Sequence, residues 1–245
     1  MTTTPPPPVE VQKQADDVRK RLAVAIPKPV VELDHENAWQ LLVATILAAQ
    51  ATDKKINEIT PALFARYPTP ADLAAADLAE VQELVKQSGF FREKAKRIIG
   101  AAQVVTERFG GEVPKTMAKL TQVPGAARKT ANVVLGMAYR KPTGVVVDTH
   151  VTRLAARLEL SVEDTPEKIE RELMTLFPKR SWIDTSHRLI LHGRYVCKAR
   201  FPRCGRCPLH EICAVAEGKK ETRGWKERAA WEQRLVESKG AVDEL

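Results

Sequence analysis

The stretch Leu120–Leu135, LTQVPGAARKTANVVL, constrains the fold more than any other part of the chain. Pro124 and Gly125 form a strong break between two runs with helical spacing, so the stretch predicts a short helix, a tight turn and a second helix. The first amides of a helix have no partners within the helix, and they suit a phosphate group. The stretch therefore predicts a docking point for a sugar-phosphate backbone.

Lys129 falls in the first turn of the second predicted helix, beside Arg128. This position is unusual, because cations are normally placed at the other end of a helix. An amine there can act as a nucleophile or as a surface lysine that contacts phosphate. The residue types alone favour the surface lysine.

The overall charge favours a polyanionic partner. The 245 residues carry 39 Lys and Arg against 31 Asp and Glu, a formal net charge of +8, and nucleic acid is the first candidate. No apolar run reaches the length of about 18 residues that a membrane span needs. The N-terminus MTTTPPPPVE also lacks the basic and apolar regions of a signal peptide. We therefore expect a cytoplasmic protein, nucleoid-associated in a bacterium, with no membrane partner.

Helical periodicity dominates the chain, and no run is typical of a sheet. Residues 9–26 fit an amphipathic helix that needs a partner surface, and the helix capped by Asn37 is apolar almost all round. The length suits one large domain or two modest ones, and we expect two. Further helices are expected after Thr69, Asp77, Phe91, Asp148 and Thr165, and from about Trp182 to Val196.

Four residues between the predicted helices have both a structural and a functional interpretation. Gln50 lies in a polar cluster that closes a buried helix, where capping and turn formation are the usual roles. Phe90 and Phe91 lie in a loop, where adjacent aromatic side chains most often fill a core; the alternative is that one of them wedges into a base stack. Asp148 is a natural N-cap for the helix THVTRLAARLEL, and capping is its simplest role.

No Asp or Glu occurs between Arg188 and Arg206. The run enters the segment that contains the cysteines, so we expect phosphate contacts from it rather than only a solvated face. Its basic residues, with His192 among them, are Arg188, Arg194, Lys198, Arg200, Arg203 and Arg206.

All four cysteines lie in one short segment. Cys197, Cys204, Cys207 and Cys213 are separated by six, two and five residues. This is a poor layout for disulfides that staple a fold and a good one for a compact metal centre. Four thiolates suit a zinc ion or a 4Fe-4S cluster, and the compact spacing favours the cluster without excluding zinc.

Taken together, these residues resemble the helix-hairpin-helix DNA glycosylase superfamily, and within it the iron-sulfur enzymes of the endonuclease III family. The resemblance rests on VPGAARKTANVVL, VVVDTH, LILHGRYVC and the Cys-x6-Cys-x2-Cys-x5-Cys loop, and it covers about residues 9–215. It implies an all-α fold of two helical domains with a DNA-binding cleft between them. The implied parts are a disordered Pro-rich tail (1–8), a six-helix domain (31–143) with the helix-hairpin-helix at 116–140, an iron-sulfur cluster domain (9–30 plus 144–215) and a charged C-terminal extension (216–245).

The resemblance also implies an activity. The protein is expected to be a bifunctional DNA glycosylase and AP lyase of base excision repair, a monomer that acts on double-stranded DNA with oxidised pyrimidines or abasic sites. Lys129 is implied as the nucleophile that forms a Schiff base with the sugar, and Asp148 as the carboxylate that stabilises the developing positive charge. A 4Fe-4S cluster is implied on Cys197, Cys204, Cys207 and Cys213. The implied DNA contacts are Gln50, Phe90, Val123, Gly125, Ala127, Arg128, His150, Arg194, Lys198 and Arg200.

Two departures from the family pattern keep alternatives open. Ala127 stands where the hairpin usually has glycine, and its Cβ is expected to widen the turn or weaken a phosphate contact. Phe90 stands where leucine is common. A catalytically weak DNA-binding protein therefore remains an alternative, as does a monofunctional glycosylase, which the presence of Lys129 and the lack of a second C-terminal domain oppose. The basic charge opposes a purely redox, ferredoxin-like role.

Overall fold

The structure of the protein is a computed structural model that describes residues 8–216. α-Helices and short 3-10 helices make up its regular structure, and no strand occurs within that range. The expected all-α fold is therefore confirmed. The chain divides into two compact units, here called the hairpin unit (Val31–Thr143) and the cysteine unit (Met1–Val30 together with Gly144–Leu245).

The expected terminal segments fall almost wholly outside the described residues. Of the Pro-rich tail at 1–8 only Pro8 is described, and of the charged extension at 216–245 only Ala216. Among the helices that are described, none is long and apolar enough to cross a membrane.

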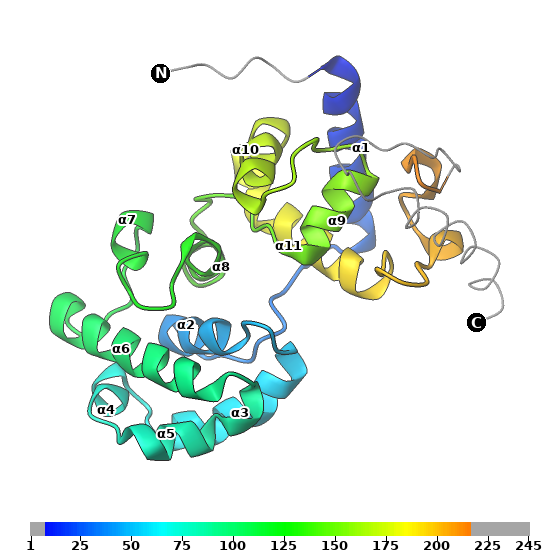
Figure 1. Ribbon diagram of the computed structural model, residues 1–245. Helices are drawn as coiled ribbons and strands as arrows, with labels where there is room; N and C mark the ends of the chain where they lie inside the picture. Colours follow the sequence, from blue (N-terminus) through cyan, green and yellow to red (C-terminus); the bar gives the residue numbers. More distant parts are fainter. Residues whose placement is uncertain (1–7, 217–245) are drawn as a thin grey trace. The chain divides into compact units, whose positions relative to one another are not determined.

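The hairpin unit is built around α2, which is buried nearly all round. Five of its side chains, Leu41, Leu42, Val43, Ala44 and Leu47, have no exposed surface. α2 contacts α3, α6 and α8, while α4 and α5 pack against α6 (Figure 1). The elements are α2 (Ala38–Leu47), α3 (Asp53–Arg66), α4 (Pro70–Ala74), α5 (Leu78–Leu84), η1 (Lys86–Ser88), α6 (Phe91–Phe109), α7 (Met117–Leu120) and α8 (Arg128–Tyr139).

Local capping fixes where several of these helices begin. The predicted cap at Asn37 is confirmed, because its side chain accepts a hydrogen bond from the Gln40 N–H at 3.0 Å. Thr69 and Asp72 form a complete capping box at the start of α4. At the start of α5, the Asp77 side chain accepts a hydrogen bond from the Glu80 N–H at 2.9 Å, and the Glu80 carboxylate accepts one from the Tyr67 hydroxyl at 2.7 Å.

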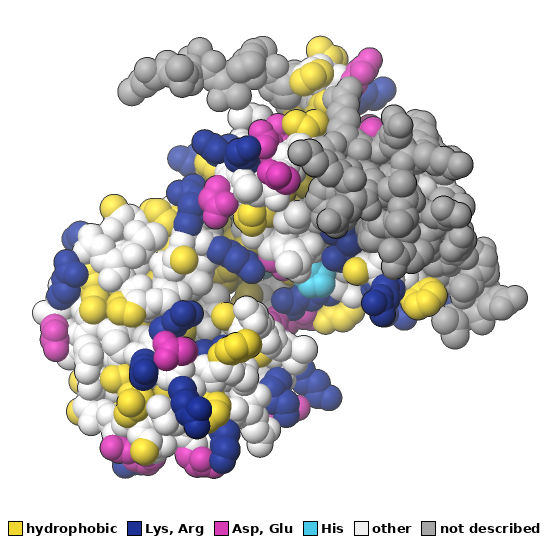
Figure 2. Space-filling model, in the orientation of Figure 1, with side chains coloured by type: hydrophobic (Ala, Val, Ile, Leu, Met, Phe, Trp, Pro, Cys, Tyr) yellow, Lys and Arg dark blue, Asp and Glu magenta, His cyan; other side chains and the backbone are white. Residues whose placement is uncertain are grey.

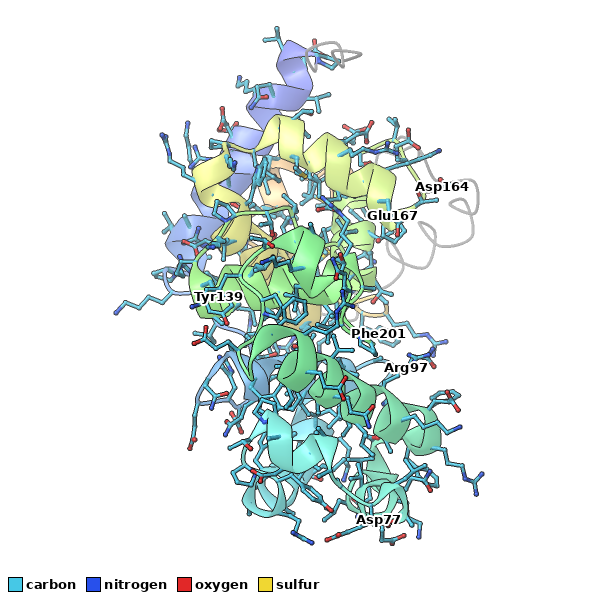
Figure 3. The ribbon with its side chains drawn as sticks, turned by 90° about the vertical axis from the view of Figure 1, so that its left-hand side faces the viewer. Asp77, Arg97, Tyr139, Asp164, Glu167 and Phe201 are labelled. Carbon is cyan, nitrogen blue, oxygen red and sulfur yellow. The ribbon has the colours of Figure 1, made fainter. Side chains whose placement is uncertain are left out.

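The end of α8 is tied to the segment that precedes α7. Tyr139 is labelled in Figure 3, and its hydroxyl donates a hydrogen bond to the Val113 carbonyl oxygen at 2.9 Å. Lys141, two residues further along, donates through Nζ to the Lys115 carbonyl oxygen at 2.8 Å. These two bonds fix the two ends of the α7–α8 pair against each other and so support the turn between them.

The cysteine unit joins the N-terminal helix to the C-terminal half of the chain, where α1 contacts α10 and α11. Gln12 Nε2 donates to the Leu176 carbonyl oxygen at 2.9 Å, and Arg188 Nε donates to the Ile26 carbonyl oxygen at 2.9 Å. The predicted amphipathic helix thus has its partner surface. The elements are α1 (Val9–Ala25), α9 (Thr149–Arg157), α10 (Pro166–Leu176), η2 (Lys179–Ser181), α11 (Trp182–Tyr195), η3 (Cys204–Arg206) and η4 (His210–Ile212).

An extended, buried segment leads into α9. Val145, Val146 and Val147 are each less than a tenth exposed, and they belong to no strand. The Val146 N–H donates to the Ser186 hydroxyl oxygen at 3.0 Å, so a side chain of α11 replaces the missing neighbouring strand. This segment fixes the entry to α9 and the position of Asp148 at its start.

Candidate active site and cysteine pocket

The turn between α7 and α8 is packed against α2. Gly125 has φ of +80°, and a Cβ at this residue would lie 3.0 Å from Cγ2 of Ile46. Val123 is 2 % exposed and Ala126 is 1 % exposed, and the Ala126 N–H donates to the Val123 carbonyl oxygen at 3.0 Å. Both the backbone conformation and the lack of space therefore require glycine at position 125.

Ala127 is the N-cap of α8, and Arg128 and Lys129 are its first two residues. Lys129 thus lies in the first turn, as the sequence predicted, and its side chain is exposed. The φ of Ala127 is −60°, a conformation that any residue with a Cβ adopts. The backbone at Ala127 is therefore unstrained, and strain gives no reason to expect that its Cβ widens the turn.

Gln50 and Phe90 are both exposed and both adopt positive φ, +56° and +48° respectively. Gln50 does not cap the next helix, since Thr52 does so by accepting from the Lys55 N–H at 3.2 Å. The interpretation of Phe90 as a core residue was wrong, because its side chain is 70 % exposed. Phe91 begins α6 and packs against the core instead.

A buried lysine lies beneath the loop that carries Phe90. Lys94 is 3 % exposed, and its Nζ donates to the Ser88 carbonyl oxygen at 2.6 Å. Burial lowers the pKa of Lys94 from its ordinary value. Lys94 was not among the predicted site residues, although REKAKRI places it among apolar positions of α6, where a charged residue needs a partner.

Asp148 occupies the N-cap of α9. Its Oδ1 accepts hydrogen bonds from the His150 N–H at 2.8 Å and the Val151 N–H at 2.9 Å. The carboxylate is half-buried, and the two bonds fix its orientation. Capping by Asp148 was predicted and is confirmed.

His150 and Arg153 connect the start of α9 to the end of α11. Arg153 Nη2 lies 3.1 Å from His150 Nδ1 and donates to the Gly193 carbonyl oxygen at 2.8 Å. Burial lowers the pKa of His150, and this effect outweighs the opposite effect of the Asp148 carboxylate. The two helices approach closely, since a Cβ on Gly193 would lie 2.8 Å from the His150 Cβ.

Arg157 lies on the inner side of the cysteine loop, the segment from Cys197 to Cys204. It is 1 % exposed, and its Nη1 donates to Cys197 Sγ at 2.8 Å and to the Lys198 carbonyl oxygen at 2.9 Å. Arg153 donates through Nε to the Cys197 carbonyl oxygen at 3.1 Å. Neither arginine was among the predicted site residues, because two arginines at i, i+4 are equally typical of a solvated helix face.

The four cysteines line one pocket. Each thiol is half-buried and none is in a disulfide. Burial raises the pKa of Cys207 to about 12, so its thiolate requires a compensating cation. Within residues 8–216, no three His, Cys, Asp or Glu side chains group closely enough to hold a single ion. The pocket also includes Arg157, Val196, Pro202, Arg203, Val215 and Ala216.

The basic residues predicted to contact phosphate follow α11 into the cysteine loop. Arg194 is in the last turn of α11, while Lys198 and Arg200 lie within the loop, the first half-buried and the second exposed. Figure 2 shows further Lys and Arg side chains over α6 of the hairpin unit. Both units therefore present positive charge to solvent.

The two units divide the predicted site residues between them. The hairpin unit brings Gly125 against Ile46 of α2, so the hairpin and the segment that continues from α2 to Gln50 are held together. The cysteine unit brings Asp148, His150 and Arg153 together with Cys197. The hairpin unit contains Gln50, Phe90, Val123, Gly125, Ala127, Arg128 and Lys129, and the cysteine unit contains Asp148, His150, Arg194, Lys198, Arg200 and the four cysteines.

Comparison with known families identifies the class of protein. The family described as HhH-GPD superfamily base excision DNA repair protein matches residues 43–179, more than half of the 245 residues. The chain belongs to this superfamily.

Curated relatives narrow the similarity to endonuclease III. Endonuclease III of Synechocystis sp. is 48 % identical over 206 residues, which are 84 % of this chain and 94 % of the relative. Endonuclease III of Bacillus subtilis is 41 % identical, covering 86 % and 95 % of the two chains. Endonuclease III of Escherichia coli K12 is 38 % identical, covering 82 % and 95 %.

Solved structures give the same result. The chain matches a trapped endonuclease III-DNA covalent intermediate with a TM-score of 0.80 and 37 % identity, over 86 % of this chain and 99 % of the other. A thermostable thymine-DNA glycosylase matches with a TM-score of 0.72 and 20 % identity, covering 85 % and 98 % of the two chains, and shares the fold.

Proposed function

We propose that this protein is a bifunctional DNA glycosylase and AP lyase of base excision repair, acting on duplex DNA that contains oxidised pyrimidines or abasic sites. The observation that carries the proposal is the exposed Lys129 in the first turn of α8, directly after a glycine turn packed on α2. The similarity to endonuclease III trapped covalently with DNA supports it. We further propose that the protein acts as a monomer in the cytoplasm.

Lys129 is the proposed nucleophile. Its neutral amine attacks C1′ of the deoxyribose, the C1′–N bond to the base breaks, and ring opening gives an iminium that links Nζ to C1′. Loss of a 2′ proton then expels the 3′ phosphate by β-elimination. Hydrolysis of the remaining iminium returns the free amine, so both the base and the 3′ strand are released in one catalytic cycle.

Asp148 is proposed to stabilise positive charge that develops on the sugar as the base leaves. A carboxylate performs this role only if it is held in place, and the hydrogen bonds from the His150 and Val151 N–H groups restrain it. The same carboxylate can accept a proton during the steps that free the Lys129 amine. Capping and catalysis are therefore compatible at this position.

The hairpin and two exposed side chains are proposed to hold the DNA. The backbone N–H groups of Gly125 and Ala127 are proposed to bind a phosphate at the start of α8, since those of Val123 and Ala126 already donate to the Leu120 and Val123 carbonyl oxygens. Reaching C1′ requires that the damaged nucleotide leaves the stack, and Gln50 and Phe90 are proposed to fill the gap it leaves. His150 is proposed to contact the same nucleotide from α9, and Arg194, Lys198 and Arg200 are proposed to contact phosphates.

A 4Fe-4S cluster is the proposed cofactor. Cys197, Cys204, Cys207 and Cys213 would hold it, and their lining of one pocket beside the Arg157 guanidinium fits a group that needs four thiolates. When bound, it would supply structural support to the cysteine loop rather than chemistry at the sugar. The loop from Cys197 to Cys204 in turn presents its cations to the DNA backbone.

Borohydride trapping on a duplex with one abasic site tests the proposal. Reduction of the iminium gives a stable covalent adduct, so the wild-type protein should form one and Lys129→Ala should not. Lys119→Ala is the matched control, because Lys119 is an exposed lysine of α7 outside the first turn of α8. It should form the adduct at the wild-type level.

Two results would contradict the proposal. An adduct formed by Lys129→Ala would show that another amine reacts. Absence of a wild-type adduct, on DNA that the protein demonstrably binds, would exclude the lyase step and indicate a monofunctional glycosylase or a binding protein. Release of thymine glycol from a duplex would then indicate a monofunctional glycosylase, and no release would indicate a binding protein.

A further inference from the structure

Phe201 is an exposed aromatic side chain in the cysteine loop. Its side chain is 62 % exposed, and its φ is +54°. Its position is marked in Figure 3. None of the roles assigned above uses it.

The backbone at Phe201 is in a conformation that bulky residues rarely adopt. Among the described residues, only Phe90 is likewise an aromatic residue with positive φ, and it too is exposed, at 70 %. Outliers of this kind persist where the surroundings over-determine them, and they cluster at ligand-binding positions. Within residues 8–216, the five non-glycine residues with positive φ are Gln50, Phe90, Arg140, Glu159 and Phe201.

Hydrogen bonds hold the loop on both sides of Phe201, so the fold itself determines that this side chain is exposed. Arg157 Nη2 donates to the Ala199 carbonyl oxygen at 3.4 Å and its Nη1 to the Lys198 carbonyl oxygen at 2.9 Å. On the other side, the Arg203 N–H donates to the Val196 carbonyl oxygen at 2.9 Å, and Pro202 is buried. With both flanks fixed, the left-handed turn holds the ring in solvent.

The charge around Phe201 indicates the kind of partner that covers it. Arg200 precedes it and Arg203 follows two residues later, and both are exposed. No acidic residue occurs from Arg188 to Arg206. An apolar ring flanked by cations in an acid-free loop complements the sugar-phosphate backbone, where the cations bind phosphates and a ring packs on the apolar faces of the sugars.

We propose that Phe201 packs against the deoxyribose backbone of duplex DNA outside the damaged nucleotide. The contact adds affinity for damaged and undamaged duplex alike and leaves lesion choice unchanged. It differs from the role proposed for Phe90, which fills the gap in the base stack. The inference rests on the proposed function, since it takes duplex DNA as the ligand.

Salt-dependent binding to an undamaged duplex distinguishes an apolar contact from an ionic one. Phe201→Ala should weaken binding by about fivefold, which is the low end of what the stacking of a base on an aromatic side chain contributes. Because no cation is removed, the slope of log affinity against log salt concentration should stay at the wild-type value. Arg200→Ala should instead reduce the magnitude of that slope by about one.

Two further variants control for the fold. Phe201→Trp keeps a large aromatic ring and should restore the affinity. Val162→Ala truncates another exposed apolar residue of the same unit, 50 % exposed, and should leave affinity unchanged. The holoprotein is used throughout, and equal visible absorbance of all variants shows that the cysteine loop is intact.

The outcomes separate this inference from the proposed function. Wild-type affinity in Phe201→Ala, or a change of its salt slope equal to that of Arg200→Ala, would overturn the inference. In either case borohydride trapping through Lys129 would still succeed. Failure of the wild-type protein both to bind duplex and to form the adduct would overturn the two proposals together.

Discussion

Arg157 Nη1 lies 2.8 Å from Cys197 Sγ, and the same guanidinium donates to the carbonyl oxygens of the next two residues of the cysteine loop. The side chain is 1 % exposed. A buried cation beside a thiolate offsets part of its charge, and hydrogen bonds to metal-ligating groups orient them. Arg157 therefore links α9, which begins at Asp148, to the proposed cluster ligands.

Replacing Arg157 should damage the cysteine pocket before it affects any DNA contact. Arg157→Leu removes the donors to the Cys197 sulfur and to the loop carbonyls, leaving buried acceptors unpaired. Breaking a buried charged network in this way typically costs about 3–5 kcal/mol. We expect reduced iron content and visible absorbance in the purified protein, together with a lower melting temperature.

Arg171→Leu is the matched control for this prediction. Arg171 is an exposed arginine of α10 in the same unit. Its replacement should leave iron content unchanged and shift stability by no more than about 0.5 kcal/mol, as is usual for surface positions. Full iron content in Arg157→Leu would mean that the hydrogen bonds to the loop do not support the cofactor.

Two substitutions at Asp148 should separate capping from catalysis. Asn is as good an N-cap as Asp, so Asp148→Asn should keep the hydrogen bonds from the His150 and Val151 N–H groups and stay near wild-type stability. Asp148→Ala should cost about 1 kcal/mol. Both should lose about 100-fold or more in base release, because both lack the carboxylate charge. Chemical denaturation and single-turnover kinetics measure the two effects, and wild-type turnover in Asp148→Asn would exclude an electrostatic role.

Two helical glycines should respond in opposite ways to alanine. Gly193 in α11 has no room, since an added Cβ would lie 2.8 Å from the His150 Cβ, and overpacking of this kind costs about 1–3 kcal/mol. Gly100 in α6 has room, since its added Cβ would lie 3.5 Å from Cγ of Pro124. Gly100→Ala should therefore stabilise the protein by up to about 1 kcal/mol through helix propensity. Equal melting temperatures of the two variants would show that α9 moves away from α11 without cost.

Local sequence chemistry predicted the framework of the fold well. Asn37 and Asp148 cap the helices that follow them, and Gly125 takes the positive φ that the hairpin turn needs. In each case a residue and its nearest neighbours along the chain determine the structure. The helix bounds around the hairpin follow for the same reason, and Lys129 enters the first turn of α8.

Features that depend on tertiary packing could not be predicted. Arg153 and Arg157 have the i, i+4 spacing of a solvated helix face, and only the carbonyl oxygens of the cysteine loop, some 40 positions later, give them a reason to be buried. Phe90 and Phe91 are chemically identical in the sequence. The left-handed backbone at Phe90 turns that ring to solvent and gives the core position to Phe91, and no pattern in the residue types indicates which of the two is exposed.

His150 should make the protein less stable in mildly acidic solution. Burial holds the pKa of His150 in the folded protein below its ordinary value of 6.5. Below that pH the unfolded chain binds a proton that the folded protein does not, so the free energy of unfolding falls as the pH falls toward the lowered pKa.

His150→Gln removes this titration and keeps an acceptor for Arg153. Between about pH 7.5 and about pH 5.5 the melting temperature of the variant should therefore fall less than that of the wild type. His35→Gln, in the hairpin unit, is the control and should follow the wild type. Equal slopes for wild type and His150→Gln would mean that His150 protonates without cost, and that the Asp148 carboxylate compensates fully for burial.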